Sequence, residues 1–179
     1  MAIIHPVTMA PAKLELLASW LPGRPWYLGD RMVPRLTKAG GFRLDDPDGR
    51  VGLEFMAVTD ASGDEPVTYH VPLSYRGAAL TGASDALIGT AEHGALGRRW
   101  MYDGTRDPVL VGQLFALILG EAEPQAQSIS NTIDPSVTIS ITGRVGEHPG
   151  EPRAPAEPPG PHVGHAGACH RRVVSGGHL

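Results

Sequence analysis

Two arginines and two aromatic side chains lie close together near the middle of the chain and could bind a sugar or an anion. They are Arg98, Arg99, Trp100 and Tyr102. An arginine guanidinium can hold a carboxylate or phosphate with two parallel hydrogen bonds, and an aromatic ring can stack on the face of a sugar. The simpler interpretation, which the spacing favours, is a strand on which exposed arginines alternate with buried aromatic rings.

A wider ligand site would add two residues from the preceding segment. On a strand predicted over residues 67–75, His70 lies on the polar side, opposite Tyr75. A surface histidine is the simpler interpretation of His70. The small-ligand hypothesis places a sugar or nucleotide site on a sheet face around His70, Tyr75, Arg98 and Trp100.

The sequence lacks the residue patterns that several kinds of catalysis require. There is no G-x-x-x-x-G-K-[S/T] phosphate loop, and the only lysines are Lys13 and Lys38. The acidic turn at 45–49 has apolar residues where a calcium loop needs its first and last ligands. The single cysteine, Cys169, and the histidines around it have irregular spacing. We predict no catalytic residue, no metal site and no cofactor.

Composition excludes some classes of partner. The formal net charge is −4 and charged residues make up 19% of the chain, which is unlike a nucleic-acid-binding surface. The longest apolar stretch, 109–119, is too short to cross a bilayer. The first residues do not combine a basic segment with a long apolar run, as a signal peptide would. We expect a cytoplasmic protein that binds neither nucleic acid nor membranes.

The distribution of proline and glycine predicts one domain and a tail. Residues 147–179 are rich in Pro, Gly, His and Ala and have few side chains able to bury apolar surface. Ordering such a segment would cost conformational entropy without compensation, so we expect a flexible tail. Residues 1–146 are expected to form a single domain.

Hydrophobic alternation and turn signals predict an antiparallel sheet within residues 1–146. Turns such as Asp46-Pro-Asp-Gly49 separate the expected strands. Pro72 favours an edge strand or a bulge, because proline cannot donate a ladder hydrogen bond. The strands are expected over 2–7, 41–45, 51–59, 67–75, 86–91, 96–102 and 135–145.

Two helices complete the expected fold. The first begins at Pro11 and ends before Pro22, with apolar residues at helical spacing. The second begins after Asp107, a suitable N-cap, has Pro108 in its first turn, and ends near Gly120. The prediction is an α+β fold in which two helices pack on one side of an antiparallel sheet.

Three segments resemble the N-terminal cap domain of actinobacterial maltokinases. Residues 20–30 read WLPGRPWYLGD and resemble the family signature W-L-P-x-x-R-W-F/Y-x-G, although Pro25 and Asp30 stand where basic residues are usual. Residues 68–73 are similar to a Y-x-L/V-P-L strand, and residues 100–109 to the L-Y-D-A-L-x-D-P entry to the cap helix. The residues that carry the signature are Trp20, Pro22, Trp26, Tyr27, Tyr102, Asp103, Asp107 and Pro108.

The resemblance, over residues 14–121, implies a role beside a sugar kinase. In maltokinases the cap packs against the ATP-binding lobe of an enzyme that makes maltose 1-phosphate. The closest match here to the family's catalytic H-G-D loop, residues 92–95, lacks the aspartate. We expect a non-catalytic module that partners or regulates a sugar kinase or an enzyme of α-glucan, maltose or trehalose metabolism. The alternatives are a small-ligand-binding domain, part of an ATP-dependent sugar kinase system, and a novel enzyme.

Overall fold

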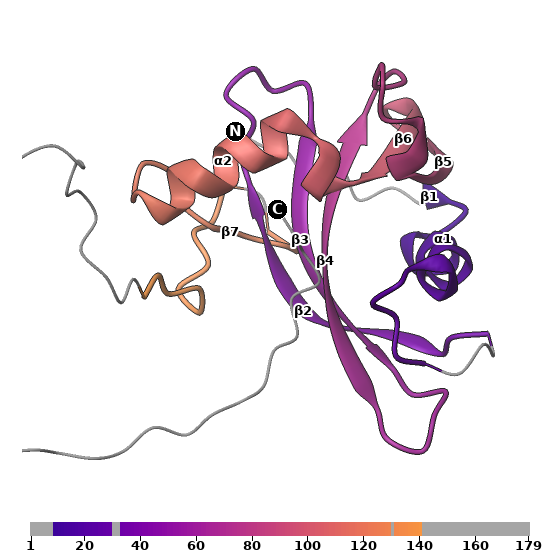
Figure 1. The fold of residues 1–179 in the computed structure, drawn as a ribbon. Coiled ribbons are helices and arrows are strands. Elements are labelled where there is room, and N and C mark those ends of the chain that lie inside the picture. The colour runs from indigo at the N-terminus through magenta and orange to yellow at the C-terminus, as the bar shows by residue number, and fades with distance from the viewer. Residues whose placement is uncertain (1–8, 30–32, 130, 141–179) are drawn as a thin grey trace, which may run out of the picture. The chain divides into compact units, whose positions relative to one another are not determined.

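Seven strands form one curled antiparallel sheet (Figure 1), in the order β1-β5-β6-β4-β3-β2-β7. The computed structural model describes residues 9–29, 33–129 and 131–140. The elements named here belong to the one of the chain's two units that includes residues 1–138. The strands are β1 (Met9–Ala10), β2 (Leu36–Leu44), β3 (Gly52–Asp60), β4 (Val67–Arg76), β5 (Leu87–His93), β6 (Gly97–Asp103) and β7 (Gln125–Ala126).

Two α-helices pack on this sheet and confirm the α+β prediction. They are α1 (Lys13–Trp20) and α2 (Pro108–Ile118), with short 3-10 segments η1 (Leu21–Gly23), η2 (Ser84–Ala86) and η3 (Gly104–Arg106). The second helix begins and ends as predicted: the Asp107 side chain accepts a hydrogen bond from the Val109 N–H, and Gly120 adopts a positive φ of 76°. The first begins later than predicted: Ala12 is its N-cap, and Lys13 instead of Pro11 is its first helical residue.

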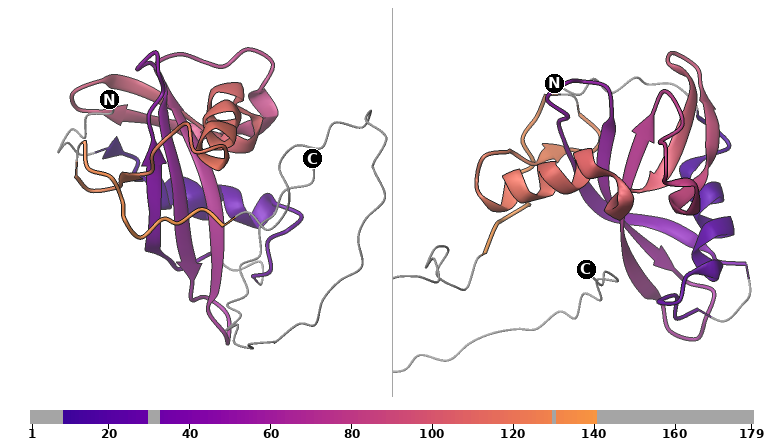
Figure 2. Two further views of the ribbon diagram at one scale, coloured as in Figure 1. Left: turned by 90° about the vertical axis from the view of Figure 1, so that its left-hand side faces the viewer. Right: turned by 45° about the horizontal axis from the view of Figure 1, so that its top comes forward.

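The two helices lie on opposite faces of the sheet, so the expectation that both cover one side is wrong (Figure 2). On β3, Val58 belongs to a core cluster with Leu17 of α1, whereas Phe55 belongs to a second cluster with Leu110 of α2. Residues three apart on a strand point to opposite faces. Since β3 has buried apolar side chains on both faces, each face requires its own helix.

Pro72 lies in a central strand and not at an edge or in a bulge. It pairs with Phe55 of β3, and β4 is also bonded to β6. The ladder between β4 and β6 begins at Leu73, directly after the proline. Pro72 is therefore tolerated because β6 stops before the position at which its missing N–H would be needed.

The predicted strand over 135–145 is wrong for residues 135–140, which form no strand. The Asp134 side chain instead accepts a hydrogen bond from the Ser136 N–H at 3.0 Å, which closes a local turn. The edge of β2 is occupied by β7, and Ile133 makes an isolated bridge to Gln125. The expected strand at 2–7, residues 141–145 and the expected tail lie outside the described residues.

A buried ion pair connects the end of β4 to the start of α2. The Nε and Nη2 atoms of Arg76 donate to the two carboxylate oxygens of Asp107, each at 2.7 Å, and the Asp107 side chain is fully buried. Burial alone would raise the pKa of Asp107, but the hydrogen bond from Arg76 and that from the Val109 N–H hold it below its ordinary value. One carboxylate therefore both begins α2 and fixes it to the sheet.

Replacing this carboxylate should destabilise the fold strongly. Asp107→Ala leaves Arg76 without its partner and removes the cap of α2, so we expect the free energy of unfolding to fall by about 3–5 kcal/mol. Urea denaturation measures the change. The matched control is Asp85→Ala, which removes an exposed ion pair with Arg106 and should cost no more than about 1 kcal/mol. Equal losses in the two variants would contradict the assigned role.

Candidate functional site

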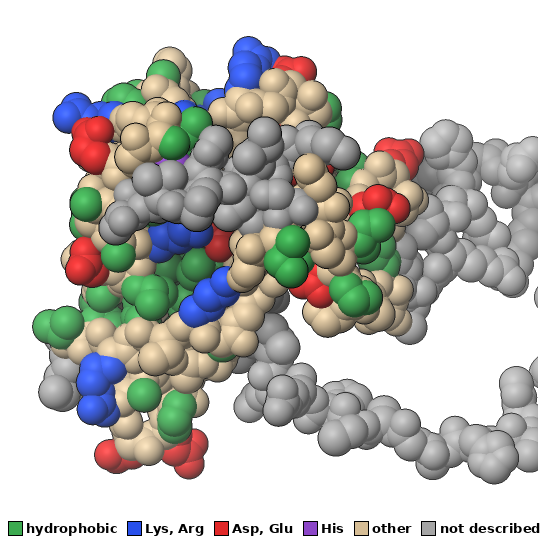
Figure 3. Space-filling model, turned by 180° about the vertical axis from the view of Figure 1, so that it is seen from behind, with side chains coloured by type: hydrophobic (Ala, Val, Ile, Leu, Met, Phe, Trp, Pro, Cys, Tyr) green, Lys and Arg blue, Asp and Glu red, His purple; other side chains and the backbone are tan. Residues whose placement is uncertain are grey.

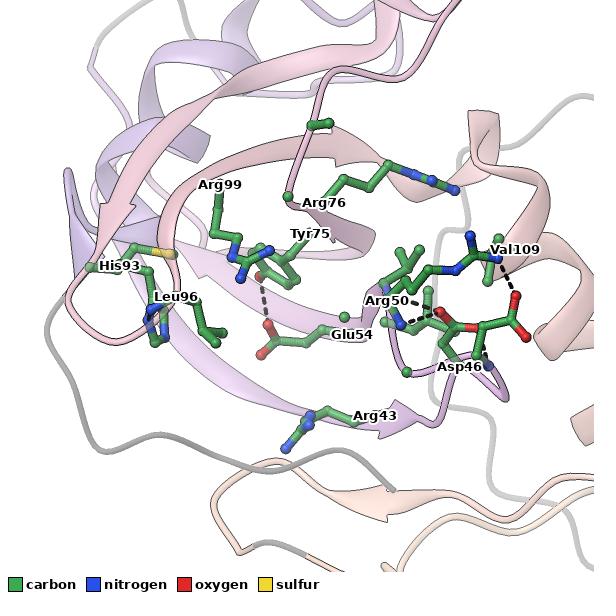
Figure 4. Close-up of a pocket in the computed structure, with 18 of the residues that line it drawn as sticks. Arg43, Asp46, Arg50, Glu54, Tyr75, Arg76, His93, Leu96, Arg99 and Val109 are labelled. Atoms are coloured by element: carbon green, nitrogen blue, oxygen red, sulfur yellow. Dashed lines mark hydrogen bonds and ion pairs between the residues drawn. The ribbon is translucent and has the colours of Figure 1, made fainter.

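A cleft of about 960 Å³ lies at the end of the sheet where β3 begins and β4 ends (Figure 4). Strands β1 to β6, the start of α1 and the segment after β4 contribute to its walls. Seen from behind, some Lys and Arg side chains lie beside hydrophobic ones near the middle of the face (Figure 3). The polar side chains that line the cleft are Lys13, Arg43, Asp46, Asp48, Arg50, Glu54, Tyr75, Arg76, His93, Arg99 and Gln127.

Glu54 is the centre of the polar network in this cleft. Glu54 is only 4% exposed, and both of its carboxylate oxygens accept hydrogen bonds. Lys13 Nζ lies 2.7 Å from Oε2, the Tyr75 hydroxyl donates to Oε2 at 2.6 Å, and the Gln127 amide donates to Oε1 at 3.0 Å. A buried charge needs such partners, and three separate segments of the chain supply them here.

Two glycines make room for this network. Gly52 is the register partner of Tyr75, and the absence of a side chain there leaves space for the tyrosine ring. A Cβ atom at Gly41 would collide with the carbonyl oxygen of Phe55 and would crowd the Gln127 amide.

Burial raises the pKa of Tyr75 well above its ordinary value, and the charge of Glu54 raises it further. Tyr75 therefore acts as a hydrogen-bond donor and not as an anion.

The cleft has more cationic side chains than carboxylates. Three of the five cations form ion pairs: Lys13 with Glu54, Arg50 with Asp48, and Arg76 with Asp107, which does not itself line the cleft. With Asp107 included, these five cations face four carboxylates, those of Asp46, Asp48, Glu54 and Asp107, so the cleft has a net charge of +1. Arg43 and Arg99 are the cations with which no described carboxylate forms an ion pair.

In the acidic turn before β3, backbone N–H groups of the turn itself occupy the carboxylate of Asp46. Asp46 accepts hydrogen bonds from the N–H groups of Asp48 at 3.0 Å, Arg50 at 2.8 Å and Val51 at 2.8 Å. The carboxylate thus shapes the turn between β2 and β3. Among the described residues, no group of three or more His, Cys, Asp or Glu side chains is placed to hold a metal ion.

The four residues predicted as a ligand site do not meet on one face. Tyr75 points into the cleft, but Trp100 pairs with Arg76, the next residue of β4, and so lies on the opposite face together with Arg98. Trp100 packs against a small core that contains Tyr102, and Arg98 donates to the exposed Glu92 at 2.9 Å. Of the predicted set, only Tyr75 lines the cleft.

His70 lies on the face that α2 covers. Its ring stacks on that of Phe55, with 6.0 Å between the centroids, and the residue is partly buried. Burial lowers the pKa of His70 below the ordinary value of 6.5. The structure thus places this histidine in a packed environment away from Tyr75.

Most residues of the cleft were not singled out from the sequence. Glu54, Arg43 and Gln127 come together only through the register of β2, β3 and the segment after β7. One signal was present: Glu54 interrupts the otherwise apolar run of β3, LEFMAV at residues 53–58. A charge inside a strand that is buried on both faces requires partners, and these partners form the network described above.

The first signature segment builds an aromatic cluster. Trp20 and Trp26 meet edge to face with centroids 5.9 Å apart, and Tyr27 stacks on Tyr69 at 5.4 Å. The Tyr27 hydroxyl donates to the buried Asp60 at 2.6 Å. Burial and the hydrogen bond to Asp60 raise the pKa of Tyr27 to about 12. Pro22 lies in η1 and ends the helix that carries Trp20.

The signature segment at residues 100–109 fixes the entry to α2. Tyr102 is buried, and its hydroxyl accepts a hydrogen bond from the Leu80 N–H at 2.9 Å. Asp103 accepts from the Thr105 N–H at 3.0 Å and so begins η3, while Asp107 begins α2 ahead of Pro108. These residues set the backbone path between β6 and α2.

Comparison with known proteins gives one match. The family model of the maltokinase N-terminal cap domain covers residues 20–107, from the start of the aromatic cluster to the N-cap of α2. No curated protein and no solved structure matches the chain. In the described part, no helix is long and apolar enough to span a membrane.

The buried environment of His70 predicts a specific pH dependence. Because its pKa in the folded state lies below 6.5, the unfolded state takes up the proton first on acidification. This contribution to stability is present above about pH 6.5 and is lost as the pH falls towards the folded-state pKa. Urea denaturation at pH 7.5 and 5.0 should show a smaller loss for His70→Gln than for the wild type. Equal losses would contradict the burial effect.

Proposed function

Because residues 20–107 belong to the family of the maltokinase N-terminal cap domain, we propose that this chain provides a non-catalytic accessory module for a sugar kinase. The module binds and regulates this kinase, or another enzyme of α-glucan, maltose or trehalose metabolism, in the cytoplasm. The observation that carries the proposal is an exposed apolar surface on α2, the helix that follows the matched residues.

This surface lies on the side of α2 that faces away from the sheet. Leu110 and Leu117 are buried on the inner side. Phe115, Ile118 and Leu119 lie on the outer side and are 56%, 41% and 57% exposed. We name these three residues the outer apolar patch. Residues three and four apart on a helix are neighbours, so the patch is continuous.

The composition of α2 supports a covered position for this patch. Its sequence, PVLVGQLFALI, contains a single polar side chain, Gln113. A helix that is apolar on all sides is typical of a buried position, whereas a helix at a free surface normally has a polar outer face. Exposed apolar patches of this kind mark binding surfaces. We therefore assign the patch to contact with the partner enzyme.

The charge beside the patch specifies the partner's chemistry further. Glu121 and Glu123 follow α2 directly and are both exposed. An apolar patch with acidic residues at one end fits an apolar surface that has basic residues beside it. The expected occupant is such a surface on the ATP-binding lobe of the kinase.

The state of the buried carboxylates supports a non-catalytic role. Catalytic acids, bases and metal ligands need oxygen atoms that can reach a substrate or an ion. Glu54 and Asp107 instead accept hydrogen bonds from the side chains described above, and Asp46 accepts them from the backbone of its own turn. Asp60 accepts hydrogen bonds from the Tyr27 hydroxyl and from the Arg35 N–H at 3.0 Å. Each of these carboxylates is used to hold the fold.

Polar substitutions in the outer apolar patch should abolish the association. The double variant Phe115→Ser/Leu119→Ser removes apolar contact area without touching the core, so its unfolding midpoint should stay close to that of the wild type. Affinity capture from extracts of the native cells, with mass-spectrometric identification, should recover a sugar kinase or α-glucan enzyme with the wild type and not with the variant. Sedimentation analysis with the purified enzyme should then show a complex.

The matched control is Leu28→Ser, which removes an exposed leucine far along the chain from α2. This variant should capture the same enzyme as the wild type. Equal capture by the patch variant, or the absence of any sugar kinase or α-glucan enzyme from the captured proteins, would contradict the proposal.

A further inference from the structure

We infer that the cleft is a binding site for a small anionic ligand, a phosphorylated sugar or a sugar acid, held through Arg43 and Arg99. This inference concerns the cleft and not the outer apolar patch, so it does not depend on the proposed association with an enzyme. The shared chemistry of the two ligand classes is an oxyanion attached to a body of sugar size.

The cleft has a positive net charge, and no described carboxylate forms an ion pair with Arg43 or Arg99. Its three carboxylates already receive hydrogen bonds from lysine, tyrosine, arginine, amide or backbone donors, so they do not need Arg43 or Arg99. Arg99 Nε is buried and has no hydrogen-bond partner among the described residues. A buried donor without a partner costs free energy, which a reorientation of the Arg99 side chain toward an oxyanion ligand would recover.

The two arginines lie on the same face of the sheet as Glu54 and Tyr75. Arg43 pairs in register with Glu54 of β3, and Arg99 lies two residues along β6 from Met101, the register partner of Tyr75. All of these side chains therefore point to the same face of the sheet. In Figure 4 the Glu54–Tyr75 pair lies between Arg99 and Arg43. A ligand seated over this pair would meet a guanidinium at either side.

Gly77 explains how Arg99 reaches this position. A Cβ atom at Gly77 would lie only 2.8 Å from Arg99 Nη1, so a side chain there would displace the guanidinium. The backbone after β4 thus leaves space for the Arg99 guanidinium at the margin of the cleft. Arginine suits this role because its planar group binds carboxylate and phosphate through two hydrogen bonds.

The remaining walls fit the body of the ligand. The volume of the cleft lies in the range of about 300–1,000 Å³ that is typical of small-molecule sites. Met9 and Leu96 add apolar surface, while the Gln127 amide adds a polar group. This mixture is suited to the hydroxyl groups and apolar faces of a sugar ring.

Isothermal titration calorimetry of the full chain tests the inference. The probes are glucose 1-phosphate, glucuronate, inorganic phosphate and neutral glucose, at low ionic strength. At least one anionic probe should bind saturably, glucose should bind more weakly than that probe, and 0.5 M NaCl should weaken anion binding. Binding of a phosphate probe assigns the oxyanion as phosphate, whereas binding of glucuronate alone assigns it as carboxylate.

Variants distinguish this site from non-specific attraction. Arg43→Gln and Arg99→Gln should each weaken binding of the anionic probe by about tenfold or more, the loss expected for one charge-assisted hydrogen-bonded group. The matched control is Arg98→Gln, which removes the same charge one residue away on the opposite face and should retain wild-type affinity. The outer-patch variant should also bind normally, which separates the two proposals. The inference would be overturned if none of the three anionic probes bound, or if Arg98→Gln weakened binding as much as Arg43→Gln and Arg99→Gln do.

Discussion

The burial of β3 and β4 on both faces is the constraint on which the rest of the structure depends. Helix α1 covers one face and α2 the other, so polar side chains on these strands must find partners within the protein. Glu54 and Asp60 of β3 do so through Lys13, Tyr75, Gln127 and Tyr27. The signature aromatic residues and the cleft are therefore two results of the same requirement, at opposite ends of one strand.

The elements that could be predicted from the sequence are those determined by local interactions. Asp107 and Gly120 mark the ends of α2 through hydrogen bonds and backbone angles within a few residues, and the turns of the hairpins are equally local. The face on which each helix packs is not local, since it depends on which side of β3 is left uncovered. Pro72 illustrates the same limit: the sequence shows a missing donor but not where β6 stops.

The site was predictable only in part for the same reason. Tyr75 was identified because its aromatic ring stands on an alternating strand, but its partner Glu54 lies 21 residues away and Gln127 lies 73 residues from Glu54. Arg98 and Trp100 were predicted by residue type, yet a shift of one residue along β6 places them on the other face from Arg99. Residue type identified the chemistry, whereas register decided which residues share a surface.

The two proposed surfaces meet at the Arg76–Asp107 pair, and this limits what each can do. Arg76 lines the cleft, while Asp107 begins the helix that carries the outer apolar patch. Withdrawing Arg76 to bind a ligand would leave a fully buried carboxylate unpaired, at a cost of about 3–5 kcal/mol. A hydrogen bond to a ligand anion contributes only about 1.5–3 kcal/mol, so the exchange is unfavourable. Arg76 therefore stays with Asp107, and an anion in the cleft would be bound by Arg43 and Arg99, which form no ion pair with a described residue.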